Sequence, residues 1–197
     1  KKKVWEAFKY AQDNGVLLVH AAGNDNEDIE KEENFPTNFK NLSDPKSFLN
    51  NVITVGASTN DDAHLRASFS NYNGKMVDVF APGQKIYSSV AGSKYQYLAG
   101  TSMATPVVEG SAAILLAYMP NLTPAQLIES FEKTVNKSTV NADVKGAPNL
   151  TFDQLSVSGG VIDDYKAAVY AYDHFYKKMP LKKGHENVRS KRSKSKK

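Results

Sequence analysis

The stretch Leu98-Ala-Gly-Thr-Ser-Met-Ala-Thr-Pro106 places a serine between a turn of small residues and a long apolar segment. The apolar segment predicts a helix from Met103 to Tyr118 that is buried almost all round, because it has no polar face apart from Glu109, which needs a partner or an exit to solvent. Pro106 is expected near the first turn of this helix, where a missing N–H costs little. Ser102 would then lie at the helix N-terminus, among free N–H groups and the positive end of the helix dipole. This environment suits an oxygen nucleophile, although a helix N-cap is the simpler role for a lone serine.

The composition is that of one globular domain with a basic C-terminal tail. The 197 residues are 41% hydrophobic and 23% charged, and no apolar run approaches the length of a membrane-spanning helix. The absence of cysteine excludes disulfides and thiolate metal sites. Residues 177–197 hold ten Lys/Arg and one acid, so we interpret 1–175 as the folded body and 176–197 as a disordered appendage. A polyanion-binding tail is the alternative, but a nucleic-acid partner is not favoured.

The rest of the chain alternates helical and strand patterns, which predicts an α/β fold. Residues 4–13 have the pattern of an amphipathic helix. The apolar run Val16–Ala22 predicts a buried parallel strand, and His20 within it is expected to be a packed, hydrogen-bonded core residue. His64 is expected to be exposed. Further segments follow along the chain: strands at 51–57 and 77–81, a hairpin from 85–89 and 94–98, a helix capped by Thr123 and begun by Pro124, irregular polar residues at 136–156, and a last helix that begins within 158–169.

The loop that follows Val16–Ala22 is the first candidate for chemistry. Ligands of open α/β sheets bind at the carboxyl ends of the strands, which is where Gly23 and Asn24 stand. The next residues, 25–34, hold six acids that could bind a hard cation such as calcium. They lack the glycine and the spacing of a dedicated calcium loop, so a solvated surface loop is favoured and no metal ligand is assigned.

Several segments in the same order resemble the subtilisin-like serine proteases, the subtilases. The segment with Ser102 resembles their nucleophile motif, and Ala21-Ala-Gly-Asn24 resembles their oxyanion-hole segment. The other matching segments are 52–57, 67–71, 78–83 and 159–168. The resemblance covers about residues 4–175 and implies a three-layer sandwich around a mostly parallel sheet. Only part of that fold is present, since the family sheet implies about four further strands before Val16.

The resemblance also implies roles for particular residues. Ser102 would be the acylating nucleophile, and the Asn24 side chain with the Ser102 N–H would form the oxyanion hole of a serine endopeptidase. The pocket for protein or peptide substrates would be lined by Ala22, Gly23, Asn34 and Gly100, and it is expected to accept fairly large apolar side chains. No cofactor is required, and structural calcium is possible. The family implies a secreted or periplasmic protein.

The histidine and aspartate of the subtilase triad are missing from the expected place. They precede the nucleophile in the order Asp, His, Ser, yet residues 1–20 contain no segment that resembles either motif. The four histidines, His20, His64, His174 and His185, all stand in the wrong context for a general base.

We therefore expect the C-terminal half of a catalytic domain, inactive by itself, whose partner is the N-terminal half of its own domain. The start at Lys1 without an initiator methionine or signal peptide agrees with a partial reading frame. Loss of the preceding strands would expose Val16–Ala22 as an apolar sheet edge. A non-catalytic pseudo-protease or binding fragment is the alternative. An α/β-hydrolase lipase is disfavoured because no G-x-S-x-G elbow is present.

Overall fold

The centre of the molecule is a five-stranded sheet in a computed structural model that describes residues 2–31, 36 and 48–179. The strand order is β1-β2-β3-β7-β6. The pairs β1–β2, β2–β3 and β3–β7 are parallel, whereas β6 is antiparallel to β7. The strands are β1 (Leu18–Ala21), β2 (Val52–Ser58), β3 (Val79–Pro82), β6 (Asn136–Lys137) and β7 (Gly160–Val161). The predicted α/β fold with a mostly parallel sheet is confirmed.

Strand β2 forms the middle of the core, and all seven of its residues are buried. Ile53 and Val55 belong to the same apolar cluster as Val108 of the following long helix. Gly56 faces the other side of the sheet, where a Cβ would lie 2.5 Å from the ring of Phe80. Because that distance is shorter than any van der Waals contact, only glycine allows the Phe80 ring to lie across this strand.

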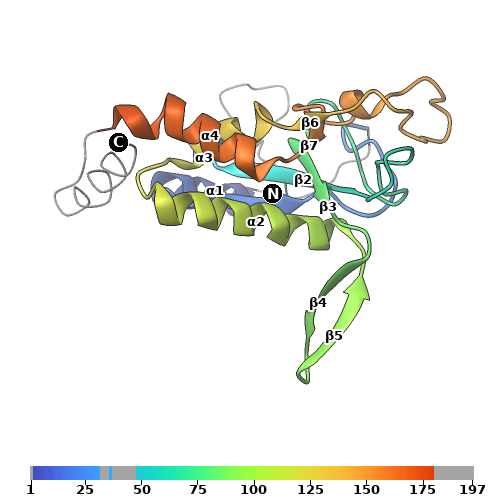
Figure 1. Cartoon of the computed structure of the whole chain (residues 1–197), viewed down its shortest axis with the longest axis horizontal. Coiled ribbons are helices and arrows are strands. Elements are labelled where there is room, and N and C mark those ends of the chain that lie inside the picture. Colours follow the sequence, from blue (N-terminus) through green and yellow to red (C-terminus); the bar gives the residue numbers. More distant parts are fainter. Residues whose placement is uncertain (1, 32–35, 37–47, 180–197) are drawn as a thin grey trace, which may run out of the picture.

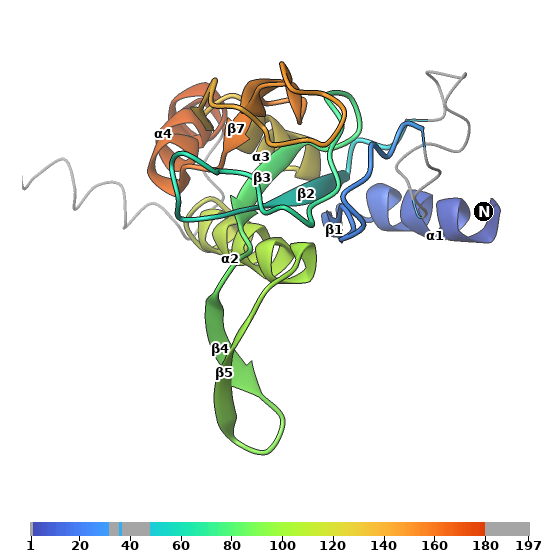
Figure 2. The ribbon, with the colours of Figure 1, turned by 90° about the vertical axis from the view of Figure 1, so that its right-hand side faces the viewer.

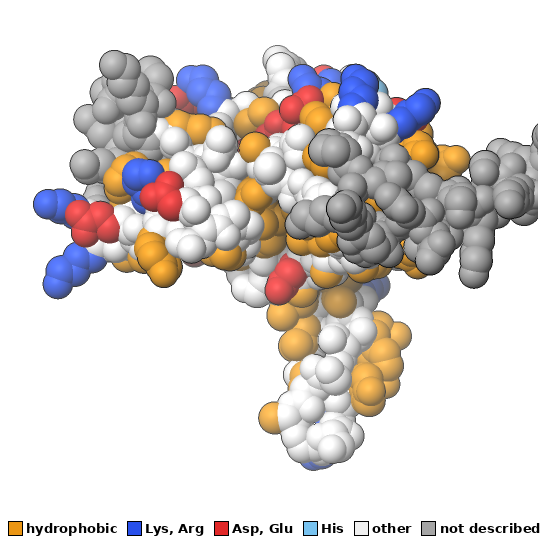
Figure 3. Space-filling model, turned by 90° about the vertical axis from the view of Figure 1, so that its left-hand side faces the viewer, with side chains coloured by type: hydrophobic (Ala, Val, Ile, Leu, Met, Phe, Trp, Pro, Cys, Tyr) orange, Lys and Arg blue, Asp and Glu red, His pale blue; other side chains and the backbone are white. Residues whose placement is uncertain are grey.

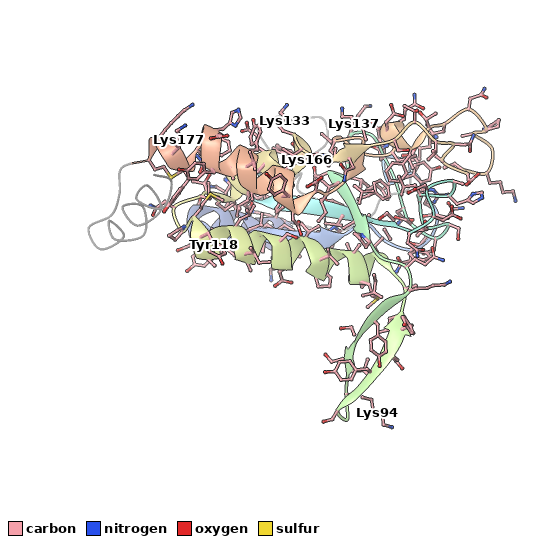
Figure 4. The ribbon with its side chains drawn as sticks, in the orientation of Figure 1. Lys94, Tyr118, Lys133, Lys137, Lys166 and Lys177 are labelled. Carbon is pink, nitrogen blue, oxygen red and sulfur yellow. The ribbon has the colours of Figure 1, made fainter. Side chains whose placement is uncertain are left out.

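Helix α2 (Thr101–Tyr118) covers one side of β1, β2 and β3, with Ala104, Val108 and Leu115 buried against the sheet. The opposite side of the helix is open, and Ile114 and Tyr118 are 59% and 71% exposed. Figure 4 shows Tyr118 at the end of α2 that lies farthest from the hairpin. The prediction of a helix buried almost all round is therefore wrong. The sheet covers a single face, and no described element covers the other.

Helices α3 (Pro124–Glu132) and α4 (Asp164–His174) lie on the other side of the sheet from α2 (Figures 1 and 2). The predicted start of α3 is confirmed. Thr123 Oγ1 accepts from Gln126 N, while Gln126 Oε1 accepts from Thr123 N at 2.9 Å. This reciprocal capping box satisfies two of the N–H groups that a helix start leaves without partners.

A hairpin of β4 (Ile86–Val90) and β5 (Lys94–Leu98) projects from the body directly before α2, as predicted (Figures 1 and 2). Lys94 stands near its tip (Figure 4). Three tyrosines share one face, and the ring centroid of Tyr87 is 4.9 Å from that of Tyr97 and 5.7 Å from that of Tyr95. All three are more than half exposed. Figure 3 shows apolar side chains gathered along this projecting arm.

Strand β1 is parallel to β2 as predicted, but it is only half-buried because it is the edge of the described sheet. Val16, just before it, is 47% exposed, so the expected apolar edge is present. His20 is also half-buried, and no described residue hydrogen-bonds to its ring, which contradicts the expected hydrogen-bonded core histidine. Helix α1 (Lys2–Asp13) contributes no buried residue. None of the described helices is long and apolar enough to cross a bilayer.

The segment 136–156 contributes more to the core than its polar sequence predicts. Val144, Phe152 and Leu155 are buried in a second apolar cluster, and the Phe152 ring lies 4.8 Å from that of Phe80 between centroids. A short 3-10 helix, Phe152–Gln154, carries Phe152, and Leu155 follows it directly. A few widely spaced apolar residues thus anchor a segment without helical or strand periodicity.

The predicted disordered tail begins at residue 176, but residues 176–179 are ordered, with a 3-10 helix at Tyr176–Lys178 and with Tyr176 and Met179 packed against the core. Residues 180–197 lie outside the described part, so the rest of the tail stays a prediction.

Candidate active site

The helix that carries Ser102 begins two residues earlier than predicted. Gly100 is the N-cap residue of α2, with no side-chain capping bond, and Thr101 is the first helical residue. Ser102 is therefore inside the first turn, and the simpler role of an N-cap is wrong. Pro106 also lies deeper in the helix than predicted. Because proline has no N–H, the carbonyl of Ser102, four residues before it, lacks the usual helical partner.

The side chain of Asn24 reaches from the end of β1 to the start of α2. Its Oδ1 accepts two hydrogen bonds from Thr101, from the backbone N–H at 2.9 Å and from the hydroxyl at 3.0 Å. The same hydroxyl accepts from Gly23 N at 3.2 Å. A backbone N–H can only donate, so the oxygen of the Asn24 amide must face Thr101. The amino end, Nδ2, is consequently left to donate elsewhere.

Two hydrogen-bond donors, Asn24 Nδ2 and Ser102 N, lie near Gly100. A Cβ built on Gly100 would lie 3.6 Å from Asn24 Nδ2 and 3.7 Å from Ser102 N. Neither donor has an acceptor among the described residues, and both Asn24 and Ser102 are exposed to solvent. Paired N–H donors at a helix N-terminus can hold an oxyanion next to a serine hydroxyl. A side chain at Gly100 would fill this space.

Of the other predicted pocket residues, Gly23 is tied to this region by its hydrogen bond to Thr101. Ala22 is completely buried behind the loop, and Gly23 has a φ of 104°. This conformation lies in the left-handed region, which glycine adopts without strain. Gly100 is hydrogen-bonded through its N–H to Gly83 O at 2.9 Å, which ties the start of α2 to the end of β3. Asn34 lies outside the described residues.

The described histidines all lie away from Ser102 in the hydrogen-bond network. His64 is exposed, as predicted, and its Nδ1 is 2.6 Å from Asp143 Oδ2, which raises the pKa of His64. His174 Nδ1 is 3.0 Å from Tyr170 O. Burial of His20 lowers its pKa. Among the described residues no histidine hydrogen-bonds to Ser102, and His185 lies outside them.

Two carboxylates of the acidic loop after Asn24, Asp28 and Glu30, bond to residues outside the loop. Asp28 accepts from Asn73 Nδ2 at 2.6 Å, and Glu30 pairs with Lys75 at 2.8 Å. These partners lower the pKa of both carboxyls. Within residues 2–31, 36 and 48–179 no group of three His, Cys, Asp or Glu side chains could hold a metal ion. Calcium binding therefore stays a prediction.

Thr101 is a functional candidate that the sequence interpretation missed. It is completely buried, and it holds the acceptor end of Asn24 through both its backbone and its hydroxyl. The available signal was its position between Gly100 and Ser102. That signal indicates a narrow turn, but it does not reveal a hydrogen bond to a residue 77 positions away.

Comparisons with known proteins identify the family that this chain resembles. A family model described as the subtilase family matches residues 1–154. The cuticle-degrading protease of Metarhizium anisopliae is 39% identical over 74% of this chain and 32% of its own length. The extracellular serine proteinase of a Thermus species is 38% identical over 69% of this chain and 30% of its own length. The chain thus spans about a third of the length of these relatives.

A solved structure of a protease is similar to this chain in its fold. The structure of the prenylagaramide maturation protease PagA superposes with a TM-score of 0.65 and 26% identity. The match covers 87% of this chain and 56% of that one.

Proposed function

Since the chain belongs to the subtilase family, we propose that it supplies the nucleophile and the oxyanion hole of a serine endopeptidase. Ser102 Oγ attacks the carbonyl carbon of a peptide bond and loses its proton to a general base. The carbonyl oxygen becomes an oxyanion that accepts from Asn24 Nδ2 and Ser102 N. The amine leaves with the proton, and water then hydrolyses the acyl-enzyme on Ser102.

The observation that carries this proposal is the pair of donors without acceptors beside Gly100. Such donors act only when charge develops on the substrate oxygen, so they lower the barrier of the chemical step. Loss of one of them costs about a hundred- to a thousandfold in rate, for which the corresponding asparagine of subtilisin is the known example. Thr101 contributes by holding the Asn24 amide in the orientation that presents Nδ2.

We propose that the histidine and its aspartate come from residues outside this chain, and that this chain alone is inactive. The lack of a histidine hydrogen-bonded to Ser102 in the described residues supports this proposal, and so do the relatives' greater lengths. Removal of triad members costs about ten thousand- to a millionfold in rate. The open face of α2 and the free edge at β1 are where the rest of such a domain would pack.

The substrates would be proteins or peptides, bound next to Gly23 and Gly100, with fairly large apolar side chains preferred; the resemblance adds Asn34 to this pocket, whereas Ala22 is buried and can only support it from behind. We place the complete protein outside the cytoplasm, secreted or periplasmic, since one relative is named an extracellular proteinase. No cofactor is needed for this chemistry, and calcium would serve a structural role.

Covalent labelling with a fluorophosphonate tests the proposal. A longer form that includes the preceding coding sequence should label on Ser102, and Ser102→Ala should abolish the label. The 197-residue chain should label poorly, because no base activates its serine. Rapid labelling of the chain alone would contradict the missing-base argument. A longer form that binds peptides without labelling would identify the alternative, a non-catalytic pseudo-protease.

A further inference from the structure

The loop that carries Asn24 has an unusual backbone. Gly23 and Asn26, on either side of it, have φ values of 104° and 58°. Positive φ is uncommon for a residue other than glycine, and asparagine is among those that tolerate it best. Residues 22–27 form no helix or strand beyond the end of β1 at Ala21. Contacts from other segments must therefore hold the loop in this shape.

One buried side chain bonds to the loop on both sides of Asn24. Asn71, which is 1% exposed, donates from Nδ2 to Ala22 O at 3.0 Å. Its Oδ1 accepts from the N–H groups of Asp25 at 3.0 Å and Glu27 at 2.9 Å. Its own backbone N–H donates to Gly23 O at 3.0 Å. Asn71 thus makes four hydrogen bonds to the loop backbone on both sides of Asn24, and none of its hydrogen bonds goes to the Asn24 side chain.

Arg66 supports the same region from further away. Its guanidinium donates to Asn26 Oδ1 at 2.8 Å and to the carbonyls of Ser68 and Ser70. The bonds to Ser68 and Ser70 hold the turn that leads to Asn71. Within the loop itself, Arg66 bonds only to the side chain of Asn26. Asn71, by comparison, bonds directly to the backbone that precedes and follows Asn24, so it is the residue best placed to control where the Asn24 amide lies.

We infer that Asn71 is a positioning residue for the oxyanion donor, an inference that rests on the proposed function. With the loop fixed, Asn24 Oδ1 stays on Thr101 and Nδ2 stays beside Ser102 N. Without the Asn71 side chain the backbone of the loop loses three hydrogen bonds, at Ala22 O, Asp25 N and Glu27 N. The bond from Asn24 to Thr101 then opens more often, and Nδ2 spends less time in place. Because the oxyanion forms only in the transition state, the loss falls on kcat rather than on KM.

Hydrogen exchange on the 197-residue chain tests the positioning role without any need for activity. The N–H of buried Thr101 donates to Asn24 Oδ1, so its exchange reports whether that bond opens. Asn71→Ala should accelerate its exchange about tenfold or more, relative to the amide of Ile162, which donates to Phe80 O elsewhere in the fold. Asn71→Asp keeps the two acceptor bonds but loses the donor to Ala22 O. It should also accelerate the exchange of Thr101, and it is the second variant if Asn71→Ala does not fold.

Asn73→Ala is the matched control. Asn73 is also buried and bonds through its side chain to Asp28 and Glu30, beyond the part of the loop that holds Asn24. It should leave the exchange of Thr101 unchanged relative to Ile162. If the Asn71 and Asn73 variants changed the exchange rate of the Thr101 amide equally, or if neither changed it, the positioning role would be overturned.

A double-mutant cycle in the longer, labelling-competent form separates this role from simple destabilisation. Asn71→Ala should lower kcat about 10- to 100-fold with little change in KM, as expected for a misplaced catalytic group. In an Asn24→Ala background the same change should have almost no effect. A full, additive loss in that background would overturn the inference. If no longer form is active, the proposed function fails, while the exchange result still decides the positioning role.

Discussion

The amide of Asn24 is fixed at its oxygen and free at its nitrogen, and this asymmetry gives the site its chemistry. Thr101 donates twice to Oδ1, so the amide cannot turn its oxygen toward the nucleophile without losing both bonds. The Ser102 N–H is free for a different reason: it belongs to the first turn of α2, which has no preceding turn to bond to. Gly100 leaves room between the two donors.

Gly100→Ala should therefore block the oxyanion site. The added methyl would stand 3.6 Å and 3.7 Å from the two donor nitrogens, where the substrate oxygen has to lie. We expect kcat of the longer form to fall on the order of 100-fold. Gly92→Ala is the control, since Gly92 at the hairpin tip also has positive φ but has open space around it. Similar losses for both variants would indicate backbone strain instead of a blocked site.

Asp78 gives the molecule a pH-dependent stability. Burial raises the pKa of this carboxyl to about 8, although Thr54 N donates to it at 2.5 Å and favours the charged form. The folded state therefore binds the proton more tightly than the unfolded state does. The resulting stability is fully present below the ordinary pKa of 3.8 and is lost as the pH rises through about 8.

Thermal unfolding at pH 5 and pH 9 measures this effect. The wild-type Tm should be lower at pH 9, and Asp78→Asn should reduce the difference because the amide does not ionise. Asp62→Asn removes an exposed carboxyl and should keep the wild-type difference. An Asp78→Asn variant with an unchanged pH dependence would show that another group is responsible.

Helix α2 has two apolar faces, but among the described residues only the face toward the sheet is covered. Its sequence could not tell which face would meet the sheet, because exposed Ile114 is as apolar as buried Leu115. Exposed apolar side chains in one row commonly mark a surface that another segment covers. The stacked tyrosines of the adjacent hairpin extend the exposed apolar surface at the other end of the helix.

We expect this open face to make the 197-residue chain self-associate. Ile114→Lys combined with Tyr118→Lys should shift sedimentation velocity profiles toward the monomer. Tyr165→Lys, an equally exposed tyrosine substitution on α4, is the control and should leave the profile unchanged. In the longer form the double substitution should instead destabilise the fold, because the face would be covered there. A monomeric wild-type chain would contradict the prediction.

The sequence predicts some parts of this molecule better than others for physical reasons. Strand β2 and the start of α3 follow from local patterns, a mainly apolar run rich in β-branched residues and a Thr-Pro start. Ser102 and Asn24 follow from short motifs. The roles of Thr101 and Asn71 depend on partners that are 77 and 46 positions away, which no local pattern encodes. The half-burial of β1 depends on what lies beside it in the sheet.

At the scale of the whole molecule, the chain presents half of an acyl-transfer site on a sheet with an open edge. Fold and family are those of the subtilases. The described residues bring Asn24, Thr101 and Ser102 together, but they bring no histidine to the serine hydroxyl. The central claim is that the free donors on Asn24 and Ser102 form an oxyanion hole when the rest of the domain is present.

The most direct test is the crystal structure of the longer form with a fluorophosphonate bound to Ser102. A phosphoryl oxygen should lie at about 2.7–3.1 Å from both Asn24 Nδ2 and Ser102 N, which is the distance range for an oxyanion-hole donor. A phosphoryl oxygen that points to solvent, with Asn24 Nδ2 bonded elsewhere, would contradict it.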